Sequence, residues 1–356
     1  MSATNTQQNA SAASSSLSAA TRGRRSNRRT WLVTAAALLS PLLVGCGNMD
    51  GELAEEADSS EAALTASTMW VGGAVTEPNS TVENWLAVSS PFGPWRVRRS
   101  FNTHLPTHIS KTSAADDVAN NVITFASVKP PSNGSIEYDI KGVADGKYDD
   151  EIRSLAASFP KDHTTYLTMF HEPENDMTGG QFVPMFKRFY KVVKAANPKI
   201  KVGTVHMSYQ WRVSSDPNLP TRNPDSWWVG PEYTDFIGVD DYNNAIDDND
   251  SKNDEVRSSA KTDKSFQRWY GWAKSKGKPL AVVEFGRFEN KAKPETMVKD
   301  LQDTEQYLRE QGFFMFLYWN GLSKKNSKGE IWDYRLYSTQ TKNAMKAISS
   351  RGRKGW

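Results

Sequence analysis

The sequence is poor in cysteine, since Cys46 is the only one among 356 residues. A chain with one cysteine forms no internal disulfide, so its folded core must be stable without covalent links. This excludes the small disulfide-stabilised folds. The length instead allows one large domain with a substantial hydrophobic core.

Lysine, aspartate and glutamate are absent from residues 1–45, which hold five arginines instead. Without these five positive charges, the formal net charge of +3 becomes −2, so the remainder gives no electrostatic reason to expect nucleic acid as a partner. After the arginines comes the apolar stretch 31–44, which is too short for a comfortable membrane span. A basic segment followed by a short apolar one is typical of an export signal.

The end of this leader carries a lipidation pattern. Leu43-Val44-Gly45-Cys46 resembles the bacterial lipobox, in which the cysteine becomes the lipidated first residue of the mature chain. The stretch 28–32 also resembles, more weakly, a twin-arginine export signal. These resemblances imply that residues 1–45 are a lipoprotein signal peptide and that the exported protein is anchored to a membrane through Cys46, facing the periplasm or the cell exterior. The alternative is that Cys46 is an ordinary buried thiol.

The remaining chain divides into a linker and one domain. Residues 46–68 are acidic and small and contain no aromatic residue, which predicts a flexible linker. From Met69 to residue 356, short apolar runs alternate with longer amphipathic ones, as in repeated β–α units. The best predicted helices are Gln181–Ala196, Lys264–Lys276 and Pro294–Glu310, and Gln210–Tyr233 is predicted to be a long loop.

Eight apolar runs in this domain are candidate strands. Eight parallel strands with helices between them would close a (β/α)8 TIM barrel as a single catalytic domain. An open, doubly wound sheet is the alternative, but no glycine-rich phosphate loop follows the first run. The candidate strands are Met69–Val75, Trp95–Phe101, Val122–Val128, Tyr166–Phe170, Lys201–His206, Phe236–Val239, Leu280–Glu284 and Phe314–Trp319.

Several familiar chemical motifs are missing. The sequence has no Gly-x-Ser-x-Gly segment, which argues against an esterase of the α/β-hydrolase type. It has no His-Glu-x-x-His segment, which argues against a zinc protease. The acidic stretch 247–255 lacks the central glycine of a calcium-binding loop and is predicted to be solvated. We therefore expect no metal ion and no cofactor.

Polar residues do occur at the ends of the predicted strands, where the active sites of such barrels lie. The fourth strand is followed by His171 and Glu172, the sixth by a segment that includes Tyr242, the seventh ends on Glu284, and the eighth ends on Trp319. Two carboxyl groups at one barrel mouth suit the cleavage of a glycosidic bond. One must be protonated to release the leaving oxygen, and the other must be ionised to attack or to stabilise the positive charge that develops on the sugar.

These segments resemble, in order and spacing, the motifs of the retaining barrel glycosidases. Tyr-Leu-Thr-Met-Phe-His-Glu-Pro-Glu-Asn (166–175) is similar to the fourth-strand motif, and its His-Glu pair resembles glycoside hydrolase family 26, the β-mannanases and related β-glycanases. Ala-Val-Val-Glu-Phe-Gly (281–286) is similar to the seventh-strand motif. The resemblance implies that Glu172 is the acid/base and Glu284 the nucleophile. It also implies that Tyr242 hydrogen-bonds the nucleophile and that Trp319 lies under the cleaved sugar.

Other residues are weaker candidates for the site. Glu174 competes with Glu172 for the acid/base role, because a side chain two positions on could project into the same mouth. His171 is a candidate to hold Glu172 or a sugar hydroxyl, the alternative being a turn cap or a core hydrogen bond. For His206 and Trp211, a place in a sugar subsite and a role in loop packing are equally open. Strand alternation allows only one of Arg98 and Arg99 to face the mouth, and Lys129 follows the third strand.

The sequence thus predicts an exported enzyme that cleaves a polysaccharide, a β-mannan or another β-glycan, with retention of configuration. Two other classes stay open. One is a non-catalytic glycan-binding lipoprotein on a decayed barrel, and the other is a metal-dependent hydrolase that would use His171, His206 and nearby acids. A barrel by itself cannot distinguish them.

Overall fold

The computed structural model describes residues 69–75, 81–102, 105, 111–132, 138–211, 223–242, 259–322 and 331–355. All of these lie within Gly51–Trp356. The predicted signal peptide, Cys46, the linker and the acidic stretch 247–255 lie outside the described residues, so those interpretations stay predictions. Within the described part of the chain, no helix has both the length and the apolar character needed to cross a bilayer.

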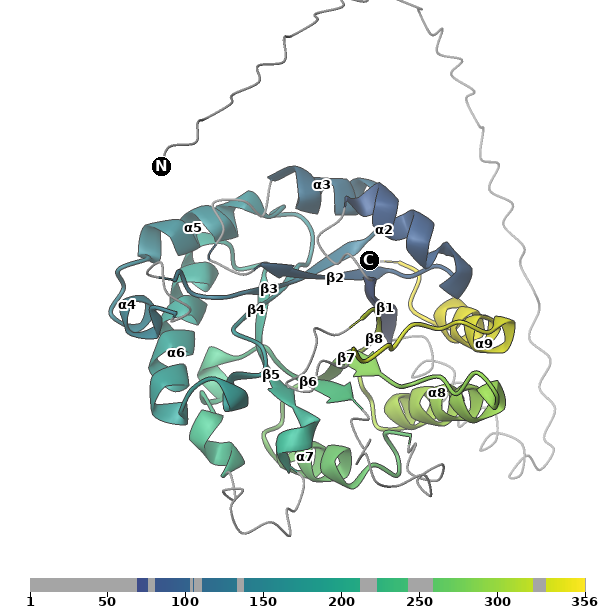
Figure 1. The fold of residues 1–356 in the computed structure, drawn as a ribbon. Helices are drawn as coiled ribbons and strands as arrows, with labels where there is room; N and C mark the ends of the chain where they lie inside the picture. Colours follow the sequence, from purple (N-terminus) through teal and green to yellow (C-terminus); the bar gives the residue numbers. More distant parts are fainter. Residues whose placement is uncertain are drawn as a thin grey trace, which may run out of the picture. The chain divides into compact units, whose positions relative to one another are not determined.

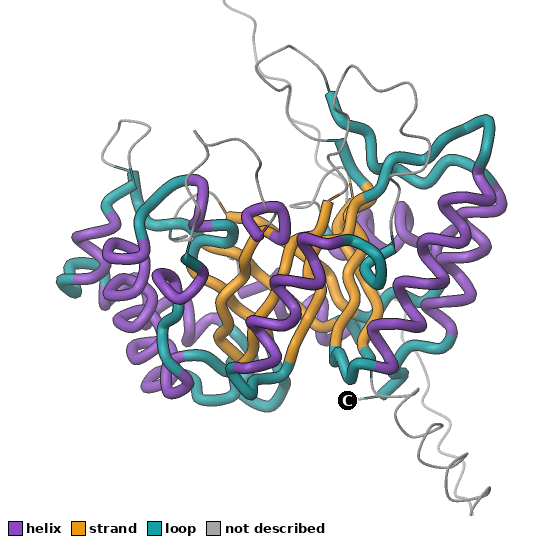
Figure 2. Tube along the Cα trace, turned by 90° about the horizontal axis from the view of Figure 1, so that it is seen from below, coloured by secondary structure: helices purple, strands orange, loops and turns teal. Residues whose placement is uncertain are grey.

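Eight parallel strands form a closed barrel in which each strand pairs with the next along the chain and β8 pairs with β1 (Figure 1). The predicted (β/α)8 barrel is confirmed, and every predicted strand is present with its ends shifted by at most a few residues. Figure 2 shows the strands enclosed by helices. The strands are β1 (Trp70–Val75), β2 (Val97–Asn102), β3 (Ile123–Val128), β4 (Tyr166–Met169), β5 (Lys201–Met207), β6 (Phe236–Tyr242), β7 (Leu280–Gly286) and β8 (Met315–Asn320).

Helices follow most strands, as a β–α repeat requires. The connection from β5 to β6 differs, because its described part holds only the short 3-10 helices η3 (Ser208–Trp211), η4 (Pro224–Trp227) and η5 (Pro231–Tyr233). This agrees with the long loop predicted there, of which residues 212–222 lie outside the described residues. The α-helices are α2 (Val82–Ser89), α3 (Lys111–Ala119), α4 (Ile140–Ala144), α5 (Asp149–Ser158), α6 (Gly179–Ala196), α7 (Lys264–Ser275), α8 (Pro294–Glu310) and α9 (Thr339–Ser350).

Local sequence signals explain where the long helices begin and end. Thr178 and Gln181 form a capping box at the start of α6, and Asn197-Pro198 stops the same helix. The side chain of Asp263 accepts hydrogen bonds from the first free amides of α7. Pro294 occupies the first turn of α8, where its missing N–H costs nothing.

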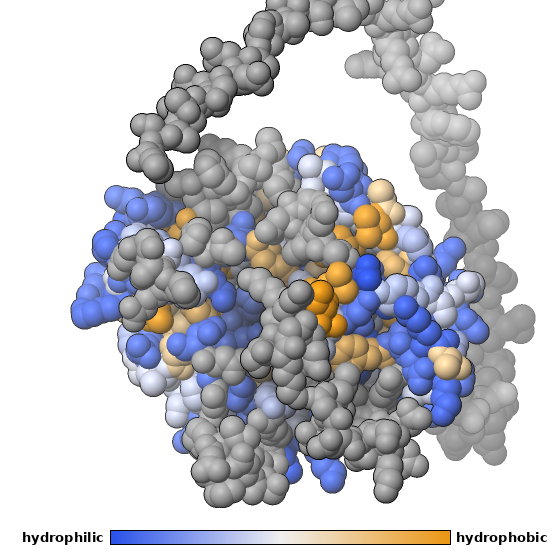
Figure 3. Space-filling view, viewed as in Figure 1, coloured by the Kyte–Doolittle hydropathy of each residue, from blue (hydrophilic) through white to orange (hydrophobic). Residues whose placement is uncertain are grey.

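The hydrophobic core has an inner and an outer layer. The inner layer takes side chains from all eight strands, including Phe125, Val205 and Leu317, and fills the barrel. The outer layer consists of two clusters between the strands and the helices. Hydrophilic residues predominate over much of the described outer surface in the space-filling view (Figure 3), as expected for helices that bury only one face.

The pairing of β7 is irregular near its carboxyl end. Its register shifts against β6 after Val239 and against β8 between Val282 and Phe285. Ala281 and Val283 belong to the inner layer of the core, whereas Val282 and Phe285 belong to the outer layer. Strict alternation would therefore turn Glu284 outward, and the irregular register brings it to the inner side instead.

Candidate active site

Glu172 lies just after β4 on strained backbone. Phe170 and Glu172 have φ of 61° and 55°, and they are two of the three non-glycine residues with positive φ in the described part of the chain. The Phe170 amide donates to the Val128 carbonyl at 2.8 Å, and the Glu172 amide donates to the Val205 carbonyl at 3.0 Å. Hydrogen bonds to both neighbouring strands thus hold a conformation that costs energy, which is common at functional sites.

Glu284 receives two strong hydrogen bonds at the end of β7. Arg99 Nη2 donates to Glu284 Oε1 at 3.0 Å, and Tyr242 Oη donates to Oε2 at 2.5 Å. The Arg99 guanidinium also lies 4.4 Å from the ring centroid of Phe101 and 4.5 Å from that of Phe125. Aromatic faces on both sides fix the cation that faces the carboxylate.

Tyr242 approaches β7 closely because Gly286 has no side chain. A Cβ atom at Gly286 would lie 2.4 Å from Cδ1 of the Tyr242 ring. Burial, with the nearby carboxylates of Glu284 and Asp240, raises the pKa of Tyr242 well above its ordinary value. The phenol therefore stays protonated and acts as a hydrogen-bond donor to Glu284, in the position that the motif predicted.

Asp240 is a neighbour of Glu284 that the sequence reasoning did not select. It is fully buried and lies in register with Glu284 on the adjacent strand. Its carboxyl oxygens make no hydrogen bond of ordinary geometry to a described residue. Burial, then the charges of Glu284 and Glu172, raise the pKa of Asp240 well above its ordinary value. A protonated Asp240 could donate to Glu284 and favour the ionised form of that neighbour.

The surroundings give Glu172 and Glu284 different affinities for a proton. Burial, then the carboxylates of Glu284 and Glu174, raise the pKa of Glu172 to about 8. Burial also raises the pKa of Glu284, but Arg99 and Tyr242 oppose that rise. Both donors stabilise the ionised form of Glu284, whereas no described residue donates such a hydrogen bond to the Glu172 carboxyl group. The proton that the pair holds near neutral pH therefore belongs on Glu172.

His171 and Trp319 lie at the same mouth as the two glutamates. The Phe101 ring makes edge contacts to both of them, at centroid distances of 5.3 Å to His171 and 5.4 Å to Trp319. Burial and the charges of Arg99 and Lys129 lower the pKa of His171 well below its ordinary value, so its ring is neutral. Phe101 is a further residue that the sequence reasoning did not select, although it ends the predicted second strand.

The two arginines of β2 face opposite sides, as alternation requires. Arg99 faces inward, to Glu284. Arg98 faces outward and binds Asp117 of α3 through two hydrogen bonds of 2.7 and 2.8 Å.

Lys129, after β3, has its ammonium 4.6 Å from the ring centroid of Phe170. Its charge acts on both His171 and Glu172, so Lys129 lies at the mouth as predicted.

Glu174, His206 and Trp211 form a buried group beside the two glutamates. Glu174 Oε1 accepts a hydrogen bond from His206 Nδ1 at 2.8 Å, and the His206 ring packs edge-on against Trp211. His206 is fully buried, and Glu174 and Trp211 are nearly so. This placement suits a supporting role for His206 and Glu174 better than a sugar contact of His206.

The metal-dependent alternative finds no site in the described residues. They contain no group of three histidine, cysteine or acidic side chains arranged to hold a metal ion, and this includes His171 and His206.

Comparisons with known proteins identify similar folds among solved structures but find no relative by sequence. No family model matches the sequence, and no curated protein matches it. Among solved structures, xylanase 10B from Thermotoga maritima aligns with a TM-score of 0.51 and 12% identity over 82% of this chain and 97% of that one. A family 39 glycoside hydrolase from the gut symbiont Bacteroides cellulosilyticus WH2 aligns with a TM-score of 0.53 and 12% identity, over 80% of this chain and 64% of the other.

A third solved structure, GH26A from Muricauda sp. MAR_2010_75, aligns with a TM-score of 0.46 and 12% identity over 76% of this chain and 90% of that one. The solved structures with the higher TM-scores are glycoside hydrolases, so the resemblance expected from the motifs is confirmed for the fold. This chain has the barrel of that class of proteins, and the identity is too low to carry more than the fold.

Proposed function

We propose that this chain is an exported, lipid-anchored retaining glycoside hydrolase that cleaves a polysaccharide, a β-mannan or another β-glycan. The observation that carries the proposal is the unequal pair of carboxyl groups at one barrel mouth. Glu172 has a pKa raised to about 8, and Glu284 is held by Arg99 and Tyr242. This is the division of roles that a double displacement at a sugar requires.

In the first step, Glu172 donates its proton to the leaving oxygen as Glu284 attacks the anomeric carbon. The glycosidic bond breaks, and an ester bond forms between the sugar and Glu284. In the second step, the Glu172 carboxylate takes a proton from water while the water oxygen attacks the same carbon and releases Glu284. The neutral ring of His171 and the partly exposed Trp319 would orient the sugar above the pair.

The rival function is glycan binding without cleavage. The buried ion pair between Arg99 and Glu284 is the observation that favours it, since a carboxylate held this firmly could be structural. The raised pKa of Glu172 favours catalysis, because an ordinary binding cleft has no need of a protonated carboxyl group beside an ionised one.

The test measures reducing-sugar release from a panel of plant, algal and bacterial-envelope polysaccharides. We expect one class of polymer to be cleaved, and Glu284→Gln to lower the rate by on the order of 10⁴-fold. The matched control is Glu305→Gln, because Glu305 is also a buried glutamate held by arginines, but it lies on α8. The control should keep nearly full activity.

Three results would decide against the proposal. Equal activity of wild type and Glu284→Gln would remove Glu284 from the mechanism. Loss of activity in a metal chelator would favour the metal-dependent class. Retention of a polymer in affinity electrophoresis, with no cleavage of any polymer, would favour the binding protein.

A further inference from the structure

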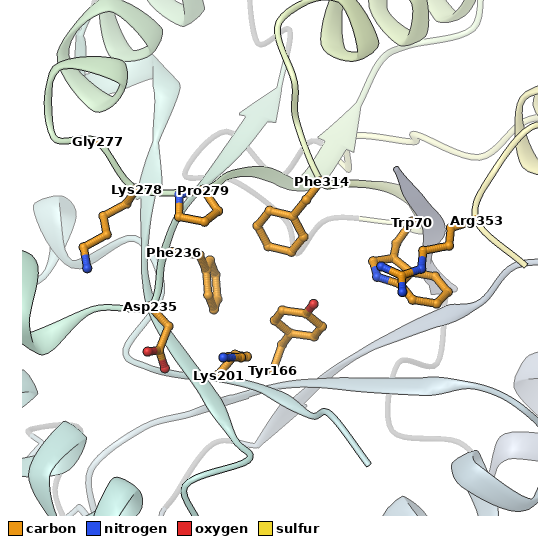
Figure 4. Close-up of a pocket in the computed structure, with 10 residues that line it drawn as sticks. All are labelled: Trp70, Tyr166, Lys201, Asp235, Phe236, Gly277, Lys278, Pro279, Phe314 and Arg353. Carbon is orange, nitrogen blue, oxygen red and sulfur yellow. The ribbon is translucent and has the colours of Figure 1, made fainter. Parts of the chain in front are cut away.

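The barrel has a cavity at the end opposite to the two glutamates. Its volume is about 490 Å³, which is within the range of small-molecule sites. Trp70, Tyr166 and Phe236 are the first residues of β1, β4 and β6, and they line this cavity (Figure 4). Glu172 and Glu284 follow or end strands at their carboxyl ends, so the cavity is separate from the candidate active site.

The wall of the cavity is an aromatic cluster. Tyr166 and Phe314 stack with ring centroids 5.5 Å apart, and Phe236 meets both rings edge-on at 5.7 and 5.8 Å. Phe125 extends the cluster into the barrel, 5.7 Å from Phe236. Figure 4 shows the three lining rings grouped around one space. Rings arranged edge-to-face and offset-stacked are favourable partners for another aromatic ring.

The rim of the cavity is positively charged. Lys201, Lys278 and Arg353 line it, together with one acid, Asp235. The acid is already engaged, because its Oδ2 accepts hydrogen bonds from Lys194 Nζ at 3.1 Å and from the Val202 amide at 2.8 Å. Within the described chain, Lys201 and Lys278 form no ion pair. An uncompensated positive rim attracts an anion.

Two other lining groups, Arg353 and Tyr166, carry polar atoms that suit a bound molecule. The Arg353 guanidinium lies 4.7 Å from the Trp70 ring centroid, and its Nε donates to the Gly355 carbonyl at 3.1 Å. Burial raises the pKa of Tyr166 to about 12, so this hydroxyl group stays neutral at the cavity. It can donate to a bound oxygen or accept a hydrogen bond from a bound hydroxyl.

We propose that this cavity binds a small planar aromatic carboxylate, with its ring against Tyr166, Phe236 and Phe314 and its carboxylate toward the cations of the rim. In a barrel of this type, the residues at the amino-terminal end ordinarily serve only to pack and stabilise the fold. An open volume beside an aromatic wall, with two lysines that form no ion pair to a described residue, is more than packing requires. This inference does not depend on the proposed glycosidase activity.

The test is isothermal titration of the protein with three matched probes. They are 4-hydroxybenzoate, 4-hydroxybenzyl alcohol, which lacks the charge, and cyclohexanecarboxylate, which lacks the aromatic ring. We expect 4-hydroxybenzoate to bind with a dissociation constant below about 1 mM, and each of the other two to bind about tenfold more weakly. Equal binding of either analogue would overturn the proposal, as would no binding of 4-hydroxybenzoate.

Charge-reversal variants then locate the bound probe. Lys278→Glu changes a partly exposed rim residue, so the fold should tolerate it, and we expect about a tenfold loss of affinity for 4-hydroxybenzoate. The control is Lys346→Glu on the exposed face of α9, which does not line the cavity. Unchanged affinity in Lys278→Glu, or loss of binding in Glu284→Gln instead, would place the probe elsewhere and contradict the proposed site.

Discussion

At the scale of single residues, Glu172 and Glu284 are chemically the same group in two different surroundings. Arg99 and Tyr242 donate hydrogen bonds to Glu284, whereas the charges of Glu284 and Glu174 act on Glu172 and, with burial, raise its pKa to about 8. The difference lies in neighbours that come from β2 and β6. For this reason the two motifs alone could suggest both roles but could not provide the electrostatic basis for them.

The raised pKa of Glu172 predicts the alkaline limb of the pH profile. On the natural polymer, kcat/KM should fall about tenfold per pH unit above about pH 8, because Glu172 loses the proton that the leaving oxygen needs. Glu172→Gln should lower kcat/KM on the polymer roughly 10²- to 10⁴-fold. An aryl glycoside with a strongly acidic leaving group needs no such proton. Its kcat/KM should lack the alkaline limb, and the same limb with both substrates would exclude Glu172 as the acid.

Asp240 should affect stability in a pH-dependent way. Its pKa is raised on folding from the ordinary 3.8, so its favourable contribution is fully present below that value and is lost as the pH rises toward its folded pKa. Asp240→Asn removes this loss. The melting temperature of the variant relative to wild type should therefore rise between about pH 4 and about pH 8. Calorimetry at the two pH values measures the difference in melting temperature between the variant and wild type. If this difference is the same at both pH values, Asp240 is not the titrating group.

At the scale of elements, the sequence predicted all eight strands and the three helices for which it gave the clearest pattern. Buried parallel strands are recognisable in the sequence as short apolar runs. The helix ends are marked by residues with local capping or stopping roles, namely Asp263, Pro294 and Asn197-Pro198. The irregular register near Glu284 could not be predicted in this way, because it depends on how β7 meets β6 and β8. Asp240 and Phe101 were not selected as site residues for the same reason, since their importance comes from residues on other strands.

The contact between Tyr242 and β7 can be tested with Gly286→Ala. The added Cβ would meet the Tyr242 ring at 2.4 Å, so the ring must move and its hydrogen bond to Glu284 should weaken. We expect kcat on a cleaved polymer to fall about 10²-fold, with a loss of about 1–3 kcal/mol in the free energy of unfolding. Gly271→Ala is the control, because that glycine in α7 has no heavy atom within 4 Å of the added Cβ. If both variants keep full kcat, the close contact has no functional role.

At the scale of the whole molecule, we propose from the predicted leader and linker that the barrel lies outside the cytoplasm, at a membrane surface. The net charge of −2 after removal of residues 1–45 leaves no strong field to hold the protein there by electrostatics. Attachment would therefore depend on the lipid at Cys46. A single acyl chain binds membranes only marginally, whereas several chains on one residue hold a protein stably.

Cys46→Ser should release the protein from the membrane. In cells that export the chain, we expect wild type in the membrane fraction and the variant in the soluble exported fraction, with equal specific activity once detergent is present. Cys46 lies outside the barrel domain, so the substitution should leave the melting temperature unchanged. A variant that stays in the membrane fraction would refute the lipid anchor, and a wild type that stays in the cytoplasm would refute export.

The proposed chemistry can be followed to a single bond, the ester between the sugar and Glu284. Once the panel identifies a cleaved polymer, the matching 2-deoxy-2-fluoro glycoside with an activated leaving group should trap that ester, because the fluorine slows its hydrolysis. The measurement is peptide mass spectrometry of the inactivated protein. We predict one glycosyl adduct, on the peptide that contains Glu284, and none in Glu284→Gln. An adduct on Glu172 or Glu174, or inversion of configuration in the product with no adduct at all, would contradict the proposed mechanism.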